Sequence, residues 1–327
     1  MKKYSADFLV RLYKTMLTIR ACEESFVEPI MKGAIRTPVH LCTGQEAVAA
    51  GVCAALSKGD SVWGNHRSHG HYLARGGNLE ELVAEIYGKA SGCARGRGGS
   101  MHVCDPEKGM RGAAPIVAGT ISLALGCALA SSIRRDGAVT VSFFGDGACG
   151  EGVLYESINF AALKRLPLIF SCENNLYSTH LPIRECRPNP VIYRTGLPFG
   201  VQSLRVDGND VLKVYDAARR AVEACRKGRG PVFIEFMTYR MRGHVGPDDN
   251  IQGTRMDIRP PREIAVWKAK DPVARLARIL LKRGIVKGPE MRAILDRTER
   301  VVREAHAAAV GNPYPAKEEL TRYVYRT

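Results

Sequence analysis

Residues 138–179 carry the clearest alternation of apolar and polar segments in the chain. Residues 139–144 are a short β-branched and aromatic run, and such a run predicts a buried strand. Over residues 151–164 the apolar positions recur at helical spacing, and after Pro167 a second apolar run, 168–172, predicts another strand. Strand, helix and strand within about thirty residues indicate a βαβ unit with a right-handed crossover. The polar residues after each strand should therefore meet at the carboxyl edge of a parallel sheet, where open α/β sheets bind ligands.

The same patterning predicts further elements on both sides of this unit. We expect an entry helix over 5–32, a short helix after Gln45, a small-residue helix over 113–130, a strand–helix–strand over 201–206, 210–225 and 232–238, a mobile loop over 246–262, and C-terminal helices over 271–283 and 289–309. Asp271 before Pro272 predicts a helix start, and Gly284 predicts its end. The chain is therefore expected to have an α/β fold, a parallel sheet flanked by helices. Residues 1–270 form its main domain and residues 271–327 a C-terminal helical extension.

The loop after the first strand of the βαβ unit suggests two kinds of ligand. Residues 145–150 have the glycine spacing GxGxxG of a dinucleotide-binding loop, and Glu173 lies near the place of its ribose-binding acid. However, Asp146 stands between the first two glycines, where a carboxylate repels a bare pyrophosphate. A magnesium ion removes that repulsion, because it binds one or two carboxylates together with phosphate oxygens. Since Asp146 and Asn175 follow neighbouring strands, we favour a metal-bridged diphosphate over NAD, and an NAD-binding protein remains the alternative.

Residues 63–77, WGNHRSHGHYLARGG, concentrate cationic and metal-ligating side chains. His66, Arg67, His69 and His71 fall within six positions. Zinc ligands rarely surround a cation, which disfavours a metal cluster. An arginine presents a two-pronged donor that suits phosphate oxygens, so a phosphate-binding loop is the better interpretation.

Composition narrows the class of protein. The 327 residues are 45% apolar, and no apolar run resembles a membrane span or a signal peptide. Ten cysteines without a CxxC pair are typical of free thiols in a reducing cytoplasm. The net charge of +15 raises nucleic-acid binding, but residues 255–327 hold 17 Lys/Arg and 9 Asp/Glu, which accounts for +8, and no nucleic-acid-binding motif is present. We therefore expect a cytoplasmic protein without a membrane or nucleic-acid partner.

With these motifs in place, a family resemblance is visible. The Gly-Asp-Gly of residues 145–147, followed about thirty residues later by Asn174-Asn175, resembles the thiamine-diphosphate motif. The whole stretch is similar to the alpha subunit of the decarboxylating component of 2-oxo acid dehydrogenase complexes, of the pyruvate or acetoin type. The resemblance implies a thiamine-diphosphate-binding fold. It also implies a Mg²⁺ ion held by Asp146, Asn175 and the carbonyl oxygen of Tyr177.

Other segments match the family residue by residue. Residues 40–47 fit the family pattern HLxxGQEA, which implies that His40 faces the reaction centre. Residues 88–102 resemble the segment that lines the entrance near the cofactor. The remaining cofactor-binding positions that the resemblance implies are His66, Arg67, Val117, Gly145, Gly147, Ala148 and His244, and His244 is expected to be catalytic as well as diphosphate-binding. Two positions depart from the family: His66 stands where pyruvate-type members usually have Tyr, and residues 115–118 read Pro-Ile-Val-Ala instead of Gly-Ile-Val-Gly.

The activity that the resemblance implies is oxidative decarboxylation of a small 2-oxo acid, with transfer of the acyl group to lipoamide. Acetoin cleavage and non-oxidative joining of carbon units, as in transketolase-like enzymes, remain alternatives. The expected partners are a beta subunit in an α2β2 assembly, a lipoyl-bearing acyltransferase and a 2-oxo acid or acyloin substrate. In the family the beta subunit supplies the glutamate for the aminopyrimidine ring. Glu46 and Glu151 are the nearest carboxylates of this chain, and the resemblance gives neither that role.

One regulatory feature of the family is expected to be missing. Val245 follows His244 where regulated members carry a serine, and residues 244–262 contain Thr254 but no serine. We therefore predict no control by serine phosphorylation in this loop.

Overall fold

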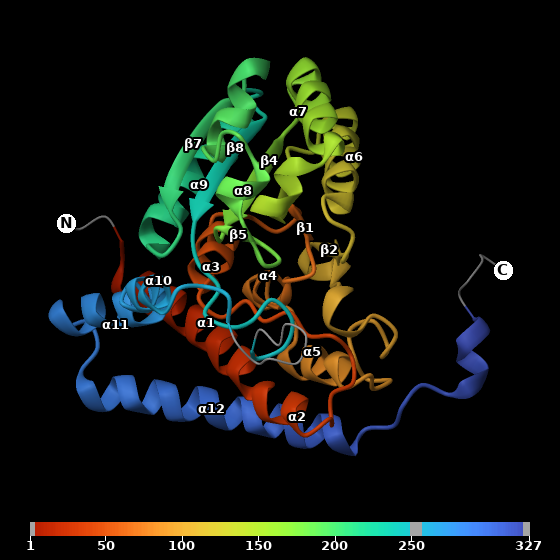
Figure 1. Ribbon diagram of the computed structural model, residues 1–327, viewed down its shortest axis with the longest axis vertical. Coiled ribbons are helices and arrows are strands. Elements are labelled where there is room, and N and C mark those ends of the chain that lie inside the picture. The colour runs from red at the N-terminus through yellow and green to blue at the C-terminus, as the bar shows by residue number, and fades with distance from the viewer. Residues whose placement is uncertain (1–3, 249–256, 323–327) are drawn as a thin grey trace.

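The computed structural model describes residues 4–248 and 257–322, and Figure 1 shows their arrangement. Its centre is a six-stranded sheet in which all neighbouring strands are parallel. The strand order is β2-β1-β3-β4-β8-β7, with bounds β1 Ser61–Gly64, β2 Met110–Ala113, β3 Thr140–Gly145, β4 Leu168–Asn174, β7 Gln202–Asp207 and β8 Val232–Met237. The direction of winding reverses between β1 and β3, since β2 lies outside β1 whereas β4 lies beyond β3. Such a switch point is where open α/β sheets form their ligand crevice.

Helices cover both faces of the sheet because its strands alternate apolar side chains between the faces. Phe144 of β3 packs in a buried cluster with residues of two helices on one face, whereas Phe143 packs on the opposite face. The first pair of helices is α6 Gly119–Arg134 and α7 Gly152–Lys164, and the second is α3 Glu46–Ala54 and α9 Val211–Arg226. The predicted βαβ unit is confirmed as β3, α7 and β4, which pair in parallel register from Thr140 opposite Leu168 to Gly145 opposite Glu173.

A further layer of helices lies beyond the carboxyl edge of the sheet. In Figure 1 the long blue α12 runs beneath the red α1, and α10 and α11 lie at one end of α1. The bounds are α1 Ala6–Ser25, α4 His69–Ala74, α5 Leu79–Ile86, α10 Pro261–Lys268, α11 Pro272–Lys282 and α12 Gly288–Gly311. Leu9 and Leu12 of α1 form one buried cluster with Leu276 and Leu280 of α11. The C-terminal helices thus pack on the first helix; the domain boundary at residue 270 stays a prediction.

The expected boundaries of α11 agree with the structure. Asp271 caps it by accepting a 2.8 Å hydrogen bond from the Ala274 N–H, and Gly284 follows its end with φ +61°. Two other expectations were wrong. The entry helix ends at Ser25, and a separate short helix, α2 Val27–Met31, follows Phe26. The small-residue helix does not begin at residue 113, because residues 110–113 form β2 and α6 starts at Gly119.

The remaining elements are short. They are the hairpin strands β5 Tyr177–Ser178 and β6 Leu181–Pro182, the helix α8 Ile183–Cys186, and 3₁₀ turns at Gly99–Met101, Pro106–Lys108, Asp146–Gly150, Ile192–Phe199 and Lys317–Thr321. Residues 249–256 of the loop expected over 246–262, with Thr254, lie outside the described residues, and α10 begins at Pro261. Within the described residues, no helix combines the length and the apolar character that a membrane crossing needs.

Candidate functional site

Asp146 occupies the carboxyl end of β3 and is nearly completely buried. The chain leaves the strand at Gly145 and turns at once into the 3₁₀ turn Asp146–Gly150, so the carboxylate faces the crevice rather than solvent. Asp146 is 1% exposed, and its Oδ2 has no hydrogen-bond partner among the described residues. Burial raises the pKa of this carboxyl to about 6. A buried carboxylate oxygen without a partner is costly, which makes it a candidate for a bound cation.

The two asparagines at the end of β4, Asn174 and Asn175, have different surroundings. Asn174 donates to the buried Glu235 at 2.7 Å and is part of the protein interior. Asn175 lines the same crevice as Asp146; its amide donates to Gln45 Oε1 and its Oδ1 accepts from the Tyr177 N–H, both at 3.2 Å. The second asparagine therefore lies beside Asp146, as the spacing predicted.

The hairpin β5–β6 approaches the glycine loop closely. A Cβ at Gly147 would lie 2.5 Å from the hydroxyl oxygen of Ser178, so any larger residue would have to displace that side chain. This approach brings Tyr177 and Ser178 to the wall of the crevice.

These groups surround a cavity of about 170 Å³ at the switch point of the sheet. Every predicted site residue lines it: His40, His66, Arg67, Val117, Gly145, Asp146, Gly147, Ala148, Asn175, Tyr177 and His244. Glu173, considered above as a ribose-binding acid, and Met101 of the entrance segment also line it, together with residues that the sequence did not single out as ligands: Gln45, Asn65, Pro115, Ile116, Ala118, Thr120, Phe144, Ser178 and Thr179. Several of these, Phe144 among them, are sequence neighbours of predicted residues, which was the available signal; nothing in the pattern pointed to Thr120.

Three imidazoles from three separate loops meet in the cavity wall. The ring centroids are 4.8 Å apart for His40 and His66, 5.2 Å for His40 and His244, and 5.6 Å for His66 and His244. Burial, and then the nearby Arg67 charge, lowers the pKa to about 3 for His40 and to about 2 for His66 and His244. All three rings are therefore neutral at physiological pH and can donate or accept a proton.

Arg67 supplies a buried positive charge beside these rings. It is 4% exposed, and its guanidinium donates to the carbonyl oxygens of Leu41 at 2.7 Å and His244 at 3.2 Å. Burial, followed by repulsion from Arg240, lowers the Arg67 pKa to about 9. A desolvated guanidinium at a cavity wall attracts an anion.

The other two histidines of residues 63–77 do not line the cavity. His69 contacts Glu23 at 2.7 Å, and His71 contacts Glu173 at 3.1 Å while it stacks on Phe143 with centroids 3.9 Å apart. The cluster that the sequence suggested is thus divided among three places. Across the described ranges, no three His, Cys, Asp or Glu residues are arranged to hold a metal ion.

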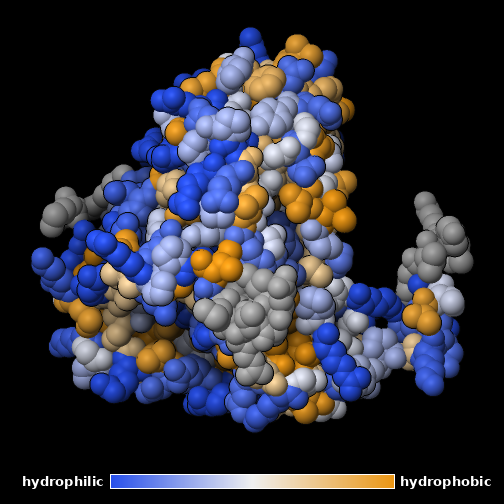
Figure 2. Space-filling view, in the orientation of Figure 1, coloured by the Kyte–Doolittle hydropathy of each residue, from blue (hydrophilic) through white to orange (hydrophobic). Residues whose placement is uncertain are grey.

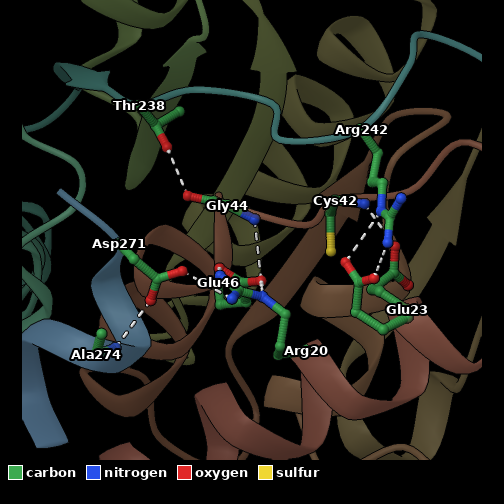
Figure 3. Close-up of polar contacts among 10 residues, drawn as sticks. Arg20, Glu23, Cys42, Gly44, Glu46, Thr238, Arg242, Asp271 and Ala274 are labelled. Atoms are coloured by element: carbon green, nitrogen blue, oxygen red, sulfur yellow. Dashed lines mark hydrogen bonds and ion pairs between the residues drawn. The ribbon is translucent and has the colours of Figure 1, made fainter. Parts of the chain in front are cut away.

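Figure 3 shows how residues 42–46, which follow His40, are fixed. Gly44 has φ +98° and lies so close to the segment after β8 that a Cβ would meet the Tyr239 carbonyl oxygen at 2.4 Å. Its N–H donates to Glu46 at 3.0 Å, and Glu46 is 0% exposed and ion-paired with Arg20, which also binds Asp271. Glu46 is therefore part of this support and does not line the cavity.

Comparison with known proteins decides the family. The sequence model described as "Dehydrogenase E1 component" matches residues 13–318. This chain belongs to the dehydrogenase E1 component family. Its relatives include the alpha subunit of acetoin:2,6-dichlorophenolindophenol oxidoreductase from Bacillus subtilis, 38% identical over 96% of this chain and 92% of the relative. Two others are pyruvate dehydrogenase E1 component alpha subunits: Zymomonas mobilis, 38% identical over 97% and 89%, and Arabidopsis thaliana chloroplastic alpha-3, 37% over 97% and 74%.

Membership confirms the resemblance and the fold class, and it implies thiamine diphosphate as the cofactor. The described relatives are named as alpha subunits, so a beta subunit is the implied partner. The E1 family also makes this chain part of an oxidoreductase, which the sequence had predicted.

Proposed function

We propose that this chain is the alpha subunit of a thiamine-diphosphate-dependent 2-oxo acid dehydrogenase, and that its cavity holds the diphosphate end of the cofactor through Mg²⁺. The observation that carries the proposal is Asp146, a buried carboxylate whose Oδ2 has no partner among the described residues, beside Asn175 in the same cavity wall. Carboxylate and amide oxygens suit magnesium, and the ion would restore the ionised form that burial disfavours.

The cavity residues fit the two charges of such a ligand. Asp146, Asn175 and the Tyr177 carbonyl oxygen are the proposed metal ligands. Arg67 would donate hydrogen bonds to diphosphate oxygens. The narrow turn over residues 145–148 would let the backbone of these residues lie close to the diphosphate. The remaining proposed cofactor contacts are His66, Val117 and His244. When bound, the thiazolium ring of the cofactor supplies the carbanion that adds to a 2-oxo group.

His40 and His244 are the proposed proton-transfer groups. Both line the cavity as neutral imidazoles, and His40 Nδ1 has no hydrogen-bond partner among the described residues. A neutral imidazole can hold an N–H against a developing negative oxygen or take a proton from a hydroxyl.

The cavity suits only part of the cofactor. Its volume of about 170 Å³ is below the roughly 300–1,000 Å³ of sites that enclose a whole ligand. Among the described residues, its only lining carboxylates are Asp146 and Glu173, which sit on adjacent strand ends at one side. Neither Glu46 nor Glu151 lines it. We infer that a beta subunit supplies the carboxylate for the aminopyrimidine ring in an α2β2 assembly.

An apolar surface continues from the cavity mouth. Ile116 and Val117 are 71% and 51% exposed although they line the cavity, and exposed apolar side chains continue over α6 and α7 at Leu123, Ile133, Phe160 and Leu163. Figure 2 shows orange groups on the side of the molecule where Figure 1 shows these two helices. Exposed apolar side chains gathered on one side of a molecule are typical of protein interfaces, and here they would contact the beta subunit.

Pyruvate is the proposed substrate, with a lipoyl-bearing acyltransferase as acyl acceptor, because most of the described relatives are named as pyruvate dehydrogenases. Acetoin is the second candidate, favoured by His66, which stands where pyruvate-type members carry Tyr, and by the Bacillus relative.

A non-oxidative carboligase has no observation of its own in its favour. Buried Asp146 disfavours NAD, which carries no metal to neutralise it. A cytoplasmic location stays a prediction, since relatives include chloroplastic and mitochondrial proteins.

The experiment is calorimetry and turnover with the chain purified alone and with its beta subunit. We expect Mg²⁺-dependent binding of thiamine diphosphate that Asp146→Ala abolishes, no binding of NAD by either protein, and turnover of pyruvate or acetoin only in the assembly. Tight NAD binding without thiamine diphosphate binding would contradict the cofactor. Turnover by the isolated chain at about one per second or faster would contradict the divided site.

A further inference from the structure

A chain of buried polar groups lies behind His40, outside the cavity wall. Glu23 of α1, His69 at the start of α4 and Ser100 in the 3₁₀ turn Gly99–Met101 are each 0% exposed. His69 Nδ1 lies 2.7 Å from Glu23 Oε1, and its Nε2 lies 2.9 Å from the Ser100 hydroxyl oxygen and 3.1 Å from the Ser100 carbonyl oxygen. Both ring nitrogens are therefore engaged, one by each neighbour.

The two ends of this chain reach the backbone on both sides of the His40 carbonyl group. The Ser100 hydroxyl accepts from the His40 N–H at 3.4 Å, and Glu23 Oε2 accepts from the Cys42 N–H at 2.5 Å, a contact drawn in Figure 3. Between them, the Leu41 carbonyl accepts from Arg67. Three successive residues are thus tethered through their main chain, whereas the His40 ring remains directed to the cavity.

The neighbouring residue of α1 tethers the loop that carries the other proposed catalytic histidine. Glu24 forms a two-pronged ion pair with Arg242, two residues before His244. The last turn of one helix therefore holds both histidine loops, with Glu23 on one and Glu24 on the other.

The complete burial of Glu23 restricts the geometry of its contacts with His69 and with the Cys42 N–H. A carboxylate that is completely withdrawn from water must be paired, and the imidazole and the Cys42 N–H are the partners it has. Charge-assisted hydrogen bonds of this kind are short and directional.

We propose that Glu23, His69 and Ser100 are positioning residues for His40, and that they fix where its ring stands toward the reacting end of the cofactor. This inference rests on the proposed function, in which His40 faces the reaction centre. None of the three lines the cavity, so they should affect turnover rather than cofactor binding.

The test uses the enzyme assembled with its beta subunit and three variants. Ser100→Ala removes one hydroxyl, and Glu23→Gln keeps the size and one acceptor but removes the charge. Ser131→Ala is the matched control, because Ser131 is 3% exposed and its hydroxyl bonds Asp136 and Ala138 away from the cavity. Thermal stability, the dissociation constant of thiamine diphosphate with Mg²⁺, KM and kcat are measured for each.

We expect Ser100→Ala and Glu23→Gln to lower kcat by about ten- to a hundredfold, since small displacements of a reacting group cost this much. Cofactor affinity should stay within about twofold of wild type, and Ser131→Ala should leave kcat unchanged. If Ser100→Ala is unstable, Glu23→Gln decides. Wild-type kcat in the variants, or a parallel loss of kcat and cofactor affinity, would overturn the positioning role while the function stands. Wild-type assembly that turns over neither pyruvate nor acetoin would overturn both.

Discussion

Replacement of Asp146 by asparagine separates folding from cofactor binding. Asp146→Asn keeps the shape of a side chain that is 1% exposed, and it removes the ionisable group. Burial raises the pKa of this carboxyl from 3.8 to about 6, so the protonated form is more favoured in the folded protein without cofactor than in the unfolded chain. Because the folded state binds this proton more tightly than the unfolded state, the stability that Asp146 contributes is complete below pH 3.8 and is lost as the pH rises through about 6.

The size of the effect follows from those two values. Above pH 7 the loss is about 3 kcal/mol, and at pH 5 it is about 1.5 kcal/mol, since one pKa unit corresponds to 1.36 kcal/mol. Asparagine does not titrate, so the free energy of unfolding of Asp146→Asn without cofactor should exceed that of wild type by about these amounts. With Mg²⁺ and thiamine diphosphate at a hundred times their dissociation constant, wild type should gain about 2.7 kcal/mol and the variant almost nothing.

Urea unfolding at pH 5 and at pH 8, each with and without Mg²⁺ and thiamine diphosphate, measures the free energy of unfolding of wild type and variant under all four conditions. Glu235→Gln is the matched control, because Glu235 is also completely buried but is bonded by Asn174, Tyr193 and Arg205. Breaking that paired carboxylate should destabilise the protein by about 3–5 kcal/mol. The reasoning fails if Asp146→Asn is less stable than wild type at pH 8 without cofactor, or if the variant gains as much stability from the cofactor as wild type.

Three further predictions concern the loops around the cavity. Gly44→Ala should lower stability by at least about 2 kcal/mol in urea unfolding, because φ is +98° and the added Cβ would lie 2.4 Å from a carbonyl oxygen. Glu85→Gln should loosen residues 94–99, whose N–H groups at four positions donate to this buried carboxylate, and faster amide exchange there would report it. Since the pKa is about 3 for His40 and about 2 for His244, kcat should show no histidine titration between about pH 5 and 8; a limb near pH 6.5 that disappears in His40→Ala would contradict this.

The parts of the site that the sequence predicted are those encoded by strong local patterns. The apolar run over residues 139–144 and the helical spacing after it predicted β3 and α7. Because parallel strands end at the same edge of a sheet, this pattern also placed Asp146 and Asn175 on one sheet edge. Strands β1 and β2 were missed because each has four residues, too few for a period to emerge, and β2 borders the small-residue segment that resembled a longer helix.

The partners of the histidines could not be predicted, because they come from distant parts of the chain. His66, His69 and His71 are nearly adjacent in sequence, yet they contact the cavity, Glu23 of α1 and Glu173 of β4 respectively. Their separation depends on the short helix α4, which begins at His69 and turns successive side chains in different directions. A pattern of residue types indicates cations in this loop but not which of them reach a ligand.

The charges around the cavity are arranged so that each disfavours the cofactor-free state. Burial raises the pKa of Asp146 to about 6 and lowers that of Arg67 to about 9, so both groups are held in the ionised form at a cost. The Arg67 side chain contacts the carbonyl oxygens of Leu41 and His244 and the His244 imidazole, and Asp146 Oδ2 has no hydrogen-bond partner among the described residues, so the two groups are not directly paired. A ligand that compensates both must carry a cation for one wall and an anion for the other. Magnesium diphosphate does so as one unit, whereas a bare diphosphate would relieve Arg67 and oppose Asp146. Metal and cofactor should therefore bind cooperatively, each raising the affinity of the other by the same factor.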